Sequence, residues 1–361
     1  MSKFSVTVLP GDGIGPEVVS QAMRVLNAVT ELGKYDFEIV SETLPVGLEA
    51  HKKHGSTLPD ITRNALGRSD GCILGPLSTH LYAGPEMINV SAFLRKTRQL
   101  HANIRPVRSH PNTPCLRKDI DFVVVRENTE GFYADRNLLD GNGEMRINED
   151  IVLSVRVVTR NVCEKLAEHA FRLARRRKRQ SLVTAAHKAN VLRKGCGLFL
   201  DSCHSVQKRY PDIKMNDVHI DVLATQLVLR PQDFDVIVTT NMFGDIISDE
   251  AAGLVGGLGL APGLNAGDKY AVAQATHGSA PDLAGRGIAN PTAEILSVAL
   301  LLDWLGETHG SLDACKASRA MEKAVNRALA APSALTPDLG GRASTADLGN
   351  AVIQEIRRLP G

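Results

Sequence analysis

Residues 234–250 read FDVIVTTNMFGDIISDE, and this stretch decides the fold class. The apolar run at 236–238 has the length and β-branching of a buried strand, and a helical pattern follows it from Asn241. In that helix Asp245 and Asp249 stand four residues apart, so both carboxylates lie on one face near its start. Carboxylates this close repel each other unless a cation or basic side chains neutralise them. The stretch indicates a βα unit with a candidate metal site; the alternative is a solvated acidic pair at a helix N-terminus.

The same alternation of apolar runs and amphipathic patterns extends along most of the chain. Strands are expected at residues 5–9, 37–40, 71–74, 122–125, 182–185 and 234–238, and helices at 17–32, 161–174, 191–210, 292–305, 312–329 and 345–358. This order predicts an α/β protein with a mostly parallel central sheet covered by helices. The polar segment 134–149 and the alternating residues behind it, up to 157, indicate an extended arm or an edge hairpin.

Composition narrows the classes of function. At 361 residues the chain is long enough for two domains. Its formal net charge is only +2 and aromatic residues make up 4%, which argues against nucleic acid as a partner. The basic run 175–179 is explained better as the C-terminus of a helix than as a phosphate-binding patch.

Cysteine usage and hydropathy indicate the compartment. The six cysteines form no CxxC pair or His-flanked metal spacing, and nothing before Val6 resembles a secretory signal. We therefore expect reduced thiols in a cytoplasmic protein. The longest uncharged stretch, near 295–302, is far shorter than the roughly 20 residues of a membrane span, so no membrane span is expected.

The first loop, PGDGIGPE at residues 10–17, is glycine-rich but is not a dinucleotide fingerprint. That fingerprint needs a third glycine three residues after the second, whereas Gly15 comes two after Gly13. A tight turn with Pro16 in the first helical turn is at least as good an explanation.

Basic and proton-transfer groups occur in several segments. Three arginines, Arg95, Arg105 and Arg126, would grip carboxylates bidentately if they met, although each alone is more often a surface ion pair. Tyr133 and Lys188 are candidates for proton transfer, with half-buried packing and exposure as their alternatives. His187 is expected to be structural.

Two further features concern a metal and a nucleotide. Asp221 is a third candidate carboxylate, and a set of oxygen ligands favours Mg2+ or Mn2+ over zinc. The small-residue loop from His277 to Asp282, followed by Asn290, would allow a nucleotide to approach the backbone. An aspartate in that loop would accept from a ribose hydroxyl and repel a 2′-phosphate.

Taken together, these segments resemble the β-decarboxylating dehydrogenases that act on isocitrate, isopropylmalate, homoisocitrate and tartrate or D-malate. The resemblance covers nearly the whole chain and rests on motifs in a fixed order: PGDGIGPE, LRK, ANIRP, RENTEGFY, HKANVL, NMFGDIISD, GLVGGLGLAPG and HGSAPDLAGRGIANPTAEILS. It implies an NAD-dependent oxidoreductase with an isopropylmalate-dehydrogenase-like two-domain fold, which is not a Rossmann fold. Residues 1–98 and 252–361 would form the large, cofactor-side domain. Residues 99–251 would form the small domain with the dimer interface and an intersubunit arm at about 134–157.

The resemblance also assigns roles by residue. Tyr133 and Lys188 would transfer protons; Arg95, Arg105 and Arg126 would hold substrate carboxylates; Asp221, Asp245 and Asp249 would bind Mg2+ or Mn2+; and Ile14, His277, Gly278, Ser279, Ala280, Asp282 and Asn290 would bind NAD. In the family, the lysine and the first aspartate come from the neighbouring subunit. The resemblance therefore implies a homodimer with shared active sites, or a tetramer built from such dimers.

The chain departs from the family pattern at three places. His101 stands where a tyrosine is usual, Gln274 where a glutamate is usual, and ENTEG replaces the ELTGG typical of isopropylmalate enzymes. Asn89 and Ser91 are polar where those enzymes present an apolar pocket, and an apolar substrate tail would leave them unpaired. Isocitrate or homoisocitrate is therefore the expected substrate, with 3-isopropylmalate or tartrate and D-malate as alternatives. A non-catalytic regulatory subunit is the alternative from another class.

Overall fold

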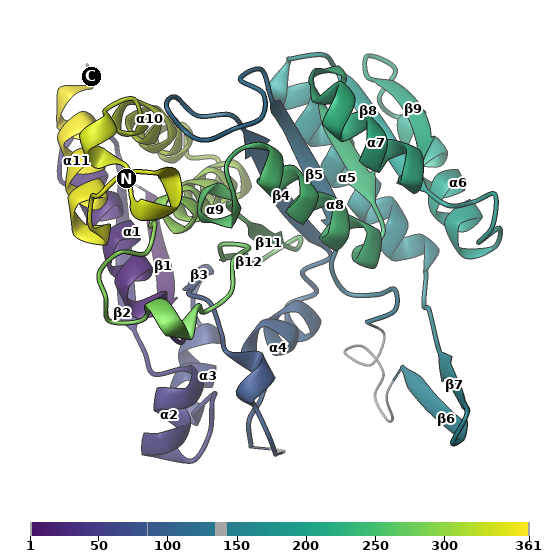
Figure 1. The fold of residues 1–361 in the computed structure, drawn as a ribbon, viewed down its shortest axis with the longest axis horizontal. Coiled ribbons are helices and arrows are strands. Elements are labelled where there is room, and N and C mark those ends of the chain that lie inside the picture. The colour runs from purple at the N-terminus through teal and green to yellow at the C-terminus, as the bar shows by residue number, and fades with distance from the viewer. Residues whose placement is uncertain (1, 85, 134–142, 360–361) are drawn as a thin grey trace.

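The centre of the protein is a mixed sheet. The computed structural model describes residues 2–84, 86–133 and 143–359, and within them a 10-stranded sheet has the order β2-β1-β3-β12-β11-β4-β5-β10-β8-β9 (Figure 1). Its strands are β1 (Ser2–Leu9), β2 (Phe37–Thr43), β3 (Gly71–Leu74), β4 (Ala102–Arg108), β5 (Asp121–Glu127), β8 (Leu182–His187), β9 (Lys214–His219), β10 (Val236–Thr239), β11 (Leu264–Ala266) and β12 (Ala271–Ala273).

Two parallel halves of the sheet meet at an antiparallel seam. The pairs β1·β2, β1·β3, β3·β12, β5·β10, β8·β10 and β8·β9 are parallel, whereas β11 runs antiparallel to both β12 and β4, and β4 runs antiparallel to β5. The predicted α/β class with a mostly parallel sheet is confirmed. At the seam Asn103 lies opposite both Asn265 and Arg126, which places three polar residues in one row across three strands.

Helices cover both faces of the sheet (Figure 1). They are α1 (Gly15–Thr30), α2 (Gly47–His54), α3 (Asp60–Leu66), α4 (Val90–Thr97), α5 (Arg160–Arg177), α6 (Gly195–Gln207), α7 (Ile220–Leu229), α8 (Asn241–Leu254), α9 (Thr292–His309), α10 (Leu312–Leu329) and α11 (Thr345–Arg358). Short 3-10 helices are η1 (Thr79–Leu81), η3 (Pro231–Asp233), η4 (Leu258–Leu260), η5 (Pro281–Leu283), η6 (Pro332–Ala334) and η7 (Pro337–Leu339). No helix among these residues is long and apolar enough to cross a membrane.

Strand alternation assigns the two faces. In β10, Val236 and Val238 pack with α5 and α6, whereas the intervening Ile237 packs with α7 and α8. Successive strand residues point to opposite faces, so a strand with helices on both sides is apolar throughout. Two other cores lie around β1, β3 and β12 and draw on residues 4–100 and 260–359. This separation of the cores supports the predicted two-domain division, which stays a prediction.

The segment expected to form an arm is a hairpin in its described part. Strands β6 (Glu144–Asn148) and β7 (Ile151–Ser154) pair antiparallel, are exposed along their length, and project away from the body of the molecule (Figure 1). Residues 134–142 of the predicted arm lie outside the described part of the chain. A role between subunits stays a prediction.

The basic run ends a helix, as expected. Residues Arg175 to Arg177 form the last turn of α5, and Lys178 follows in the left-handed conformation. Each arginine has an acidic partner: Arg175 pairs with Asp212, Arg176 with Asp303 and Arg177 with Asp235. These three arginines are therefore neutralised within the chain, as expected for the end of a helix rather than a phosphate-binding patch. All six cysteines are free thiols, as predicted.

Candidate active site

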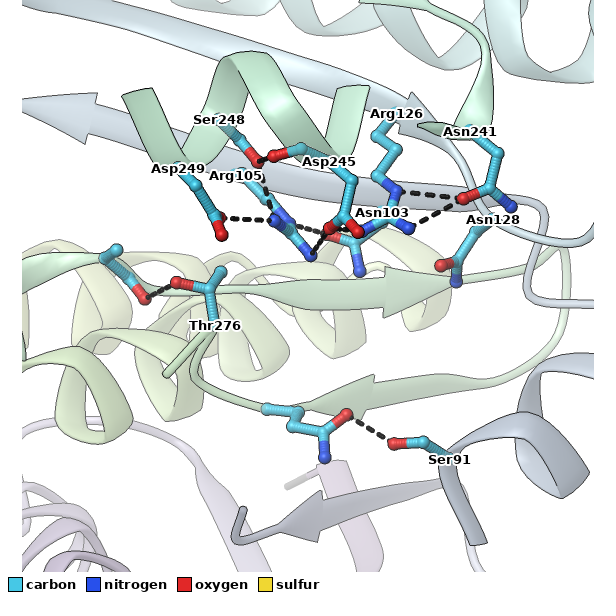
Figure 2. Close-up of polar contacts among 12 residues, drawn as sticks. Ser91, Asn103, Arg105, Arg126, Asn128, Asn241, Asp245, Ser248, Asp249 and Thr276 are labelled. Carbon is cyan, nitrogen blue, oxygen red and sulfur yellow. Dashed lines mark hydrogen bonds and ion pairs between the residues drawn. The ribbon is translucent and has the colours of Figure 1, made fainter. Parts of the chain in front are cut away.

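The two aspartates of α8 lie on one face of the helix, as predicted, and point at the seam of the sheet (Figure 2). The Asp245 carboxylate contacts the Arg126 guanidinium, and its Oδ1 is also 3.4 Å from Arg105 Nη2. The Asp249 Oδ1 is 3.3 Å from Arg105 Nη1. We call these four residues the acid–arginine cluster. Basic side chains of the same chain therefore supply part of the neutralisation that the acidic pair requires.

Arg126 reaches the cluster because α8 has a glycine where the two meet. A Cβ atom added to Gly244 would stand 2.6 Å from Arg126 Cγ, which no side chain tolerates without displacement. The Nε and Nη2 atoms of Arg126 donate to Asn241 Oδ1 at 3.1 and 2.7 Å. The first turn of α8 thus fixes the plane of this guanidinium.

Arg105 is oriented by the polar row of the seam. Its Nε donates to Asn103 Oδ1 at 2.8 Å, and its Nη1 donates to Ser248 Oγ at 2.6 Å. Asn265 Oδ1 in turn accepts from Asn103 at 2.8 Å and from Asn128 at 2.9 Å. These supporting residues were missed from the sequence, although Asn103 and Arg105 share one strand face by their spacing of two.

Burial separates the two kinds of charge. The side chains of Arg105 and Arg126 are only 9% and 3% exposed, whereas those of Asp245 and Asp249 are 35% and 55% exposed. Burial and the neighbouring Arg105 lower the pKa of Arg126 to about 10. Burial also raises the pKa of Asp249, against the opposing effect of Arg105. The cluster therefore presents accessible carboxylates backed by buried cations.

Of the two predicted proton-transfer residues, one joins this cluster. The half-buried Tyr133 donates its hydroxyl to Asp245 Oδ2 at 3.4 Å. Lys188 follows β8 and instead contacts Asp221, in the first turn of α7, with 2.5 Å between Nζ and Oδ1. The hydrogen bond from Lys188 is the main cause of a lowered pKa of Asp221. We call these two residues the Lys188–Asp221 pair.

One chain brings together two of the three predicted metal ligands. Among the described residues, the oxygens of Asp221, Asp245 and Asp249 do not gather within the 4.8 Å that a shared ion requires. Asp245 and Asp249 do converge on Arg105 and are accessible. Two accessible carboxylates suit a hard cation such as Mg2+ or Mn2+. Asp221 does not group with them in one chain, and its contribution from a second copy stays a prediction.

The predicted substrate residues of α4 are already engaged. Asn89 is the N-cap of α4, and its side chain accepts from Ala92 N at 3.0 Å. Ser91 Oγ donates to Gln274 Oε1 at 2.7 Å (Figure 2 labels Ser91). These contacts engage Asn89 Oδ1 and Ser91 Oγ within the chain. The substrate-binding role of both residues stays a prediction. Arg95 lies half-buried in the last turn of α4, and its role stays a prediction.

The first loop packs directly on the predicted cofactor loop. Ile14 N donates to Ser279 O at 2.9 Å, and a Cβ atom on Gly13, which has a φ of +59°, would stand 2.0 Å from the same oxygen. Asp12 accepts from Leu48 N and Ser78 N, at 2.7 and 2.8 Å, and so ties this turn to two other segments. Pro16 lies in the first turn of α1, as expected for a tight turn.

The loop itself has features that suit a nucleotide. His277 Nε2 is buried and has no hydrogen-bond partner among the described residues. Gly278 and Asp282 are exposed, and Ala280 between them has a φ of +38°. Asn290, in contrast, donates to Asp338 Oδ2 and accepts from Thr292 N, both at 3.0 Å. Its amide is therefore occupied by the protein, and its cofactor role stays a prediction.

Comparisons with known proteins agree with these features. Residues 5–352 match the family model described as isocitrate/isopropylmalate dehydrogenase. The chain is 43% identical to a 3-isopropylmalate dehydrogenase of Archaeoglobus fulgidus, with 96% of this chain and 98% of that protein covered. It is 41% identical to an isocitrate/homoisocitrate dehydrogenase of Thermus thermophilus, with 99% of each covered. A crystal structure of isocitrate dehydrogenase from Methylococcus capsulatus superposes with a TM-score of 0.85 at 40% identity, covering 99% of this chain and 100% of that one.

Proposed function

This chain belongs to the isocitrate/isopropylmalate dehydrogenase family, and we propose that it oxidises and decarboxylates a 2-hydroxy acid with a malate core, using NAD and Mg2+ or Mn2+. Enzymes of this family are NAD-dependent decarboxylating oxidoreductases that act on hydroxy acids, which agrees with the enzyme class expected from the motifs. The observation that carries the proposal is the acid–arginine cluster, in which buried guanidinium groups lie behind two accessible carboxylates.

The arginines would bind the acid. Hydrogen bonds to Asn103 and Asn241 fix the orientations of the Arg105 and Arg126 guanidinium groups. Binding of substrate carboxylates to them would therefore cost less side-chain conformational entropy. Arg95 would add a third contact from α4. When bound, a divalent cation held by Asp245, Asp249 and the Asp221 of a second copy supplies positive charge next to the substrate hydroxyl and carboxylate. NAD, bound at loop 277–282, supplies the hydride acceptor.

Two residues would move protons. Lys188 would take part in removing the hydroxyl proton as hydride leaves, and Tyr133 would return a proton to the enol carbon after CO2 departs. The hydrogen bond from Tyr133 to Asp245 supports this role. Lys188 lies with Asp221 instead, which supports a donation of both residues to a second copy of the chain.

We propose a homodimer with shared active sites, or a tetramer of such dimers. Apolar side chains are exposed on the helix that carries Asp221 and on its neighbour: Val222 and Leu229 of α7 and Ile246 of α8. The hairpin β6–β7 likewise exposes Ile151 and Leu153. Exposed apolar side chains that gather on one surface mark an interaction site.

Isocitrate or homoisocitrate is the proposed substrate, and 3-isopropylmalate or tartrate and D-malate are the alternatives. The Ser91–Gln274 contact is uncharged, so a third carboxylate directed at it would meet no repelling group there. Asp282 is exposed in the cofactor loop, where a carboxylate would repel a 2′-phosphate, so NAD is proposed over NADP. The free thiols support action in the cytoplasm.

A substrate panel tests the proposed function. Purified protein with Mg2+ and NAD is assayed with isocitrate, homoisocitrate, 3-isopropylmalate, D-malate and tartrate, and specificity constants are compared. We expect reduction of NAD, fastest with isocitrate or homoisocitrate and much slower with NADP. No turnover with any of these acids would favour the non-catalytic regulatory subunit, although Tyr133, Lys188 and the three aspartates are all retained.

A further inference from the structure

Three side chains from distant parts of the sequence converge outside the acid–arginine cluster. His101 lies just before β4, His169 is on α5, and Asp268 is in the turn between β11 and β12. One ligand atom of each lies within 4.8 Å of the others. His101 is also one of the positions where the chain departs from the family pattern.

Two of these side chains have buried nitrogen atoms without hydrogen bonds. His101 and His169 are 3% and 8% exposed, and within the described part of the chain the Nε2 atom of each has no partner. The ring centroids are 5.0 Å apart, and His101 Nε2 is 3.9 Å from Asp268 Oδ1. Buried polar atoms are usually hydrogen-bonded, so two unpaired nitrogens at one place favour a partner that both can reach.

The surrounding contacts leave a lone pair on His101 and an oxygen of Asp268 facing the cluster. His101 Nδ1 donates to Gln99 O at 3.1 Å, which puts the proton on Nδ1 and the lone pair on Nε2. Asp268 Oδ2 accepts from Lys165 Nζ at 2.6 Å, and Oδ1 is left on the side of His101. Burial lowers the pKa of both histidines, that of His169 to about 3, so both rings are neutral, as metal ligands must be.

We propose that His101, His169 and Asp268 form a second metal site, which binds a transition-metal dication of the Zn2+ type and joins α5 to the β11–β12 turn. Two imidazoles and one carboxylate suit zinc, whereas Mg2+ prefers oxygen ligands alone. Zinc–ligand bonds are about 2.0–2.1 Å long, so two ligand atoms of a tetrahedral zinc ion lie roughly 3.4 Å from each other. Zinc binding therefore draws the three ligand atoms together by about 1 Å, and Asp268, which is exposed in a turn and paired with the flexible side chain of Lys165, can supply part of that movement.

Two cations near the site limit its affinity. Arg172 Nη2 is 3.5 Å from His169 Nδ1, and a guanidinium only donates, so in the ion-free protein His169 carries its proton on Nε2. Zinc binding at Nε2 moves that proton to Nδ1, and the exposed Arg172 then turns toward solvent. Lys165 remains on the far oxygen of Asp268 as an outer partner.

Zinc titration of the chelator-treated protein tests the proposal. Excess Mg2+ is present throughout, and calorimetry is expected to detect one Zn2+ per chain. At a free concentration 100-fold above Kd the melting temperature is expected to rise by about 4 °C. Anomalous scattering from a zinc-soaked crystal is expected to place the ion between His101, His169 and Asp268.

Variants locate the site. Two variants, Asp268→Asn and His169→Gln, are expected to abolish the zinc-induced rise in melting temperature. Asp268 lies in an exposed turn, which tolerates substitution. Asp245→Asn and the matched buried variant His110→Gln are expected to retain the rise. No zinc binding beyond the acid–arginine cluster, or binding that Asp268→Asn and His169→Gln leave unchanged, would overturn the proposal and leave a bridging water as the partner of the two nitrogens.

Discussion

The acid–arginine cluster and the Lys188–Asp221 pair contain the same kinds of charge in opposite surroundings. In the cluster the arginine side chains are 9% and 3% exposed and several hydrogen bonds fix each one. In the pair Lys188 is 26% and Asp221 is 62% exposed. The cluster is therefore assembled by folding of a single chain, whereas the pair lies at the surface, where the proposed shared site would place it beside a second copy of the chain.

This difference has an energetic consequence. Removing one partner from a buried ion pair costs about 3–5 kcal/mol, because the other charge stays buried without compensation. An exposed ion pair contributes only about 0–1 kcal/mol to the free energy of unfolding. Changes in the cluster should therefore affect stability and turnover together, whereas changes in the pair should affect turnover alone.

The largest effect is expected from Asp245→Asn. Turnover should fall by about 1,000-fold or more, because the variant removes a proposed metal ligand and the partner of Arg126. The free energy of unfolding should also fall, by about 2 kcal/mol, because the buried Arg126 loses its charged partner while solvent still reaches the position of the carboxylate. Steady-state kinetics and urea denaturation measure the two quantities. Glu250→Gln on the same helix is the control, and unchanged turnover in Asp245→Asn would remove this residue from the site.

Lys188→Met should separate activity from stability. We expect turnover to fall about 100-fold or more, as for loss of a proton-transfer group, while the free energy of unfolding changes by less than about 0.5 kcal/mol. Lys316→Met breaks a comparable exposed pair with Asp313 at 2.8 Å and should change neither quantity. A large loss of stability in Lys188→Met would show that the pair is structural and would break the contrast.

A smaller effect is expected where α8 passes Arg126. Gly244→Ala forces the new methyl group against Arg126 and should lower the free energy of unfolding by about 2 kcal/mol. At Gly253 in the same helix, an added Cβ atom would have no described atom outside the helix within 4 Å, so Gly253→Ala should raise the free energy of unfolding by about 0.5–1 kcal/mol. Equal effects in the two variants would mean that close packing on Arg126 does not hold the cluster together.

The smallest effect concerns an uncharged contact. Ser91→Ala breaks the hydrogen bond to Gln274 and should lower the specificity constant for isocitrate about tenfold, while that for 3-isopropylmalate changes little. Thr97→Ala on the same helix, where the hydroxyl bonds only to backbone, is the control. A parallel loss with both acids would show that Ser91 positions α4 and does not select the substrate.

The sequence predicted those features that depend on local spacing. The strand and helix around Asp245, the two helices at 312–329 and 345–358, and the end of α5 at the basic run follow from periodicity, capping and charge. The N-cap role of Asn89 was readable in the same way, since an asparagine before a helical pattern is a strong start signal.

Other features depend on contacts between distant segments. Strands β11 and β12 have three residues each, and half of the six are alanine, so they are too short to show an alternation of apolar and polar residues. The antiparallel seam that they form was therefore not predicted. The pairing of Arg105 with Asp249 and the approach of His101 to His169 arise only when the sheet forms. Sequence spacing alone gives no sign of either.

Mixed dimers test the shared active site most directly. Asp245→Asn and Lys188→Met chains carry different affinity tags, are co-expressed, and the doubly tagged dimer is isolated. Each parent homodimer should be inactive, but the mixed dimer should regain about half of wild-type activity, because one of its two sites combines Asp245 of one chain with Lys188 of the other. A mixed dimer as inactive as its parents would contradict the account, because each chain would then use its own lysine.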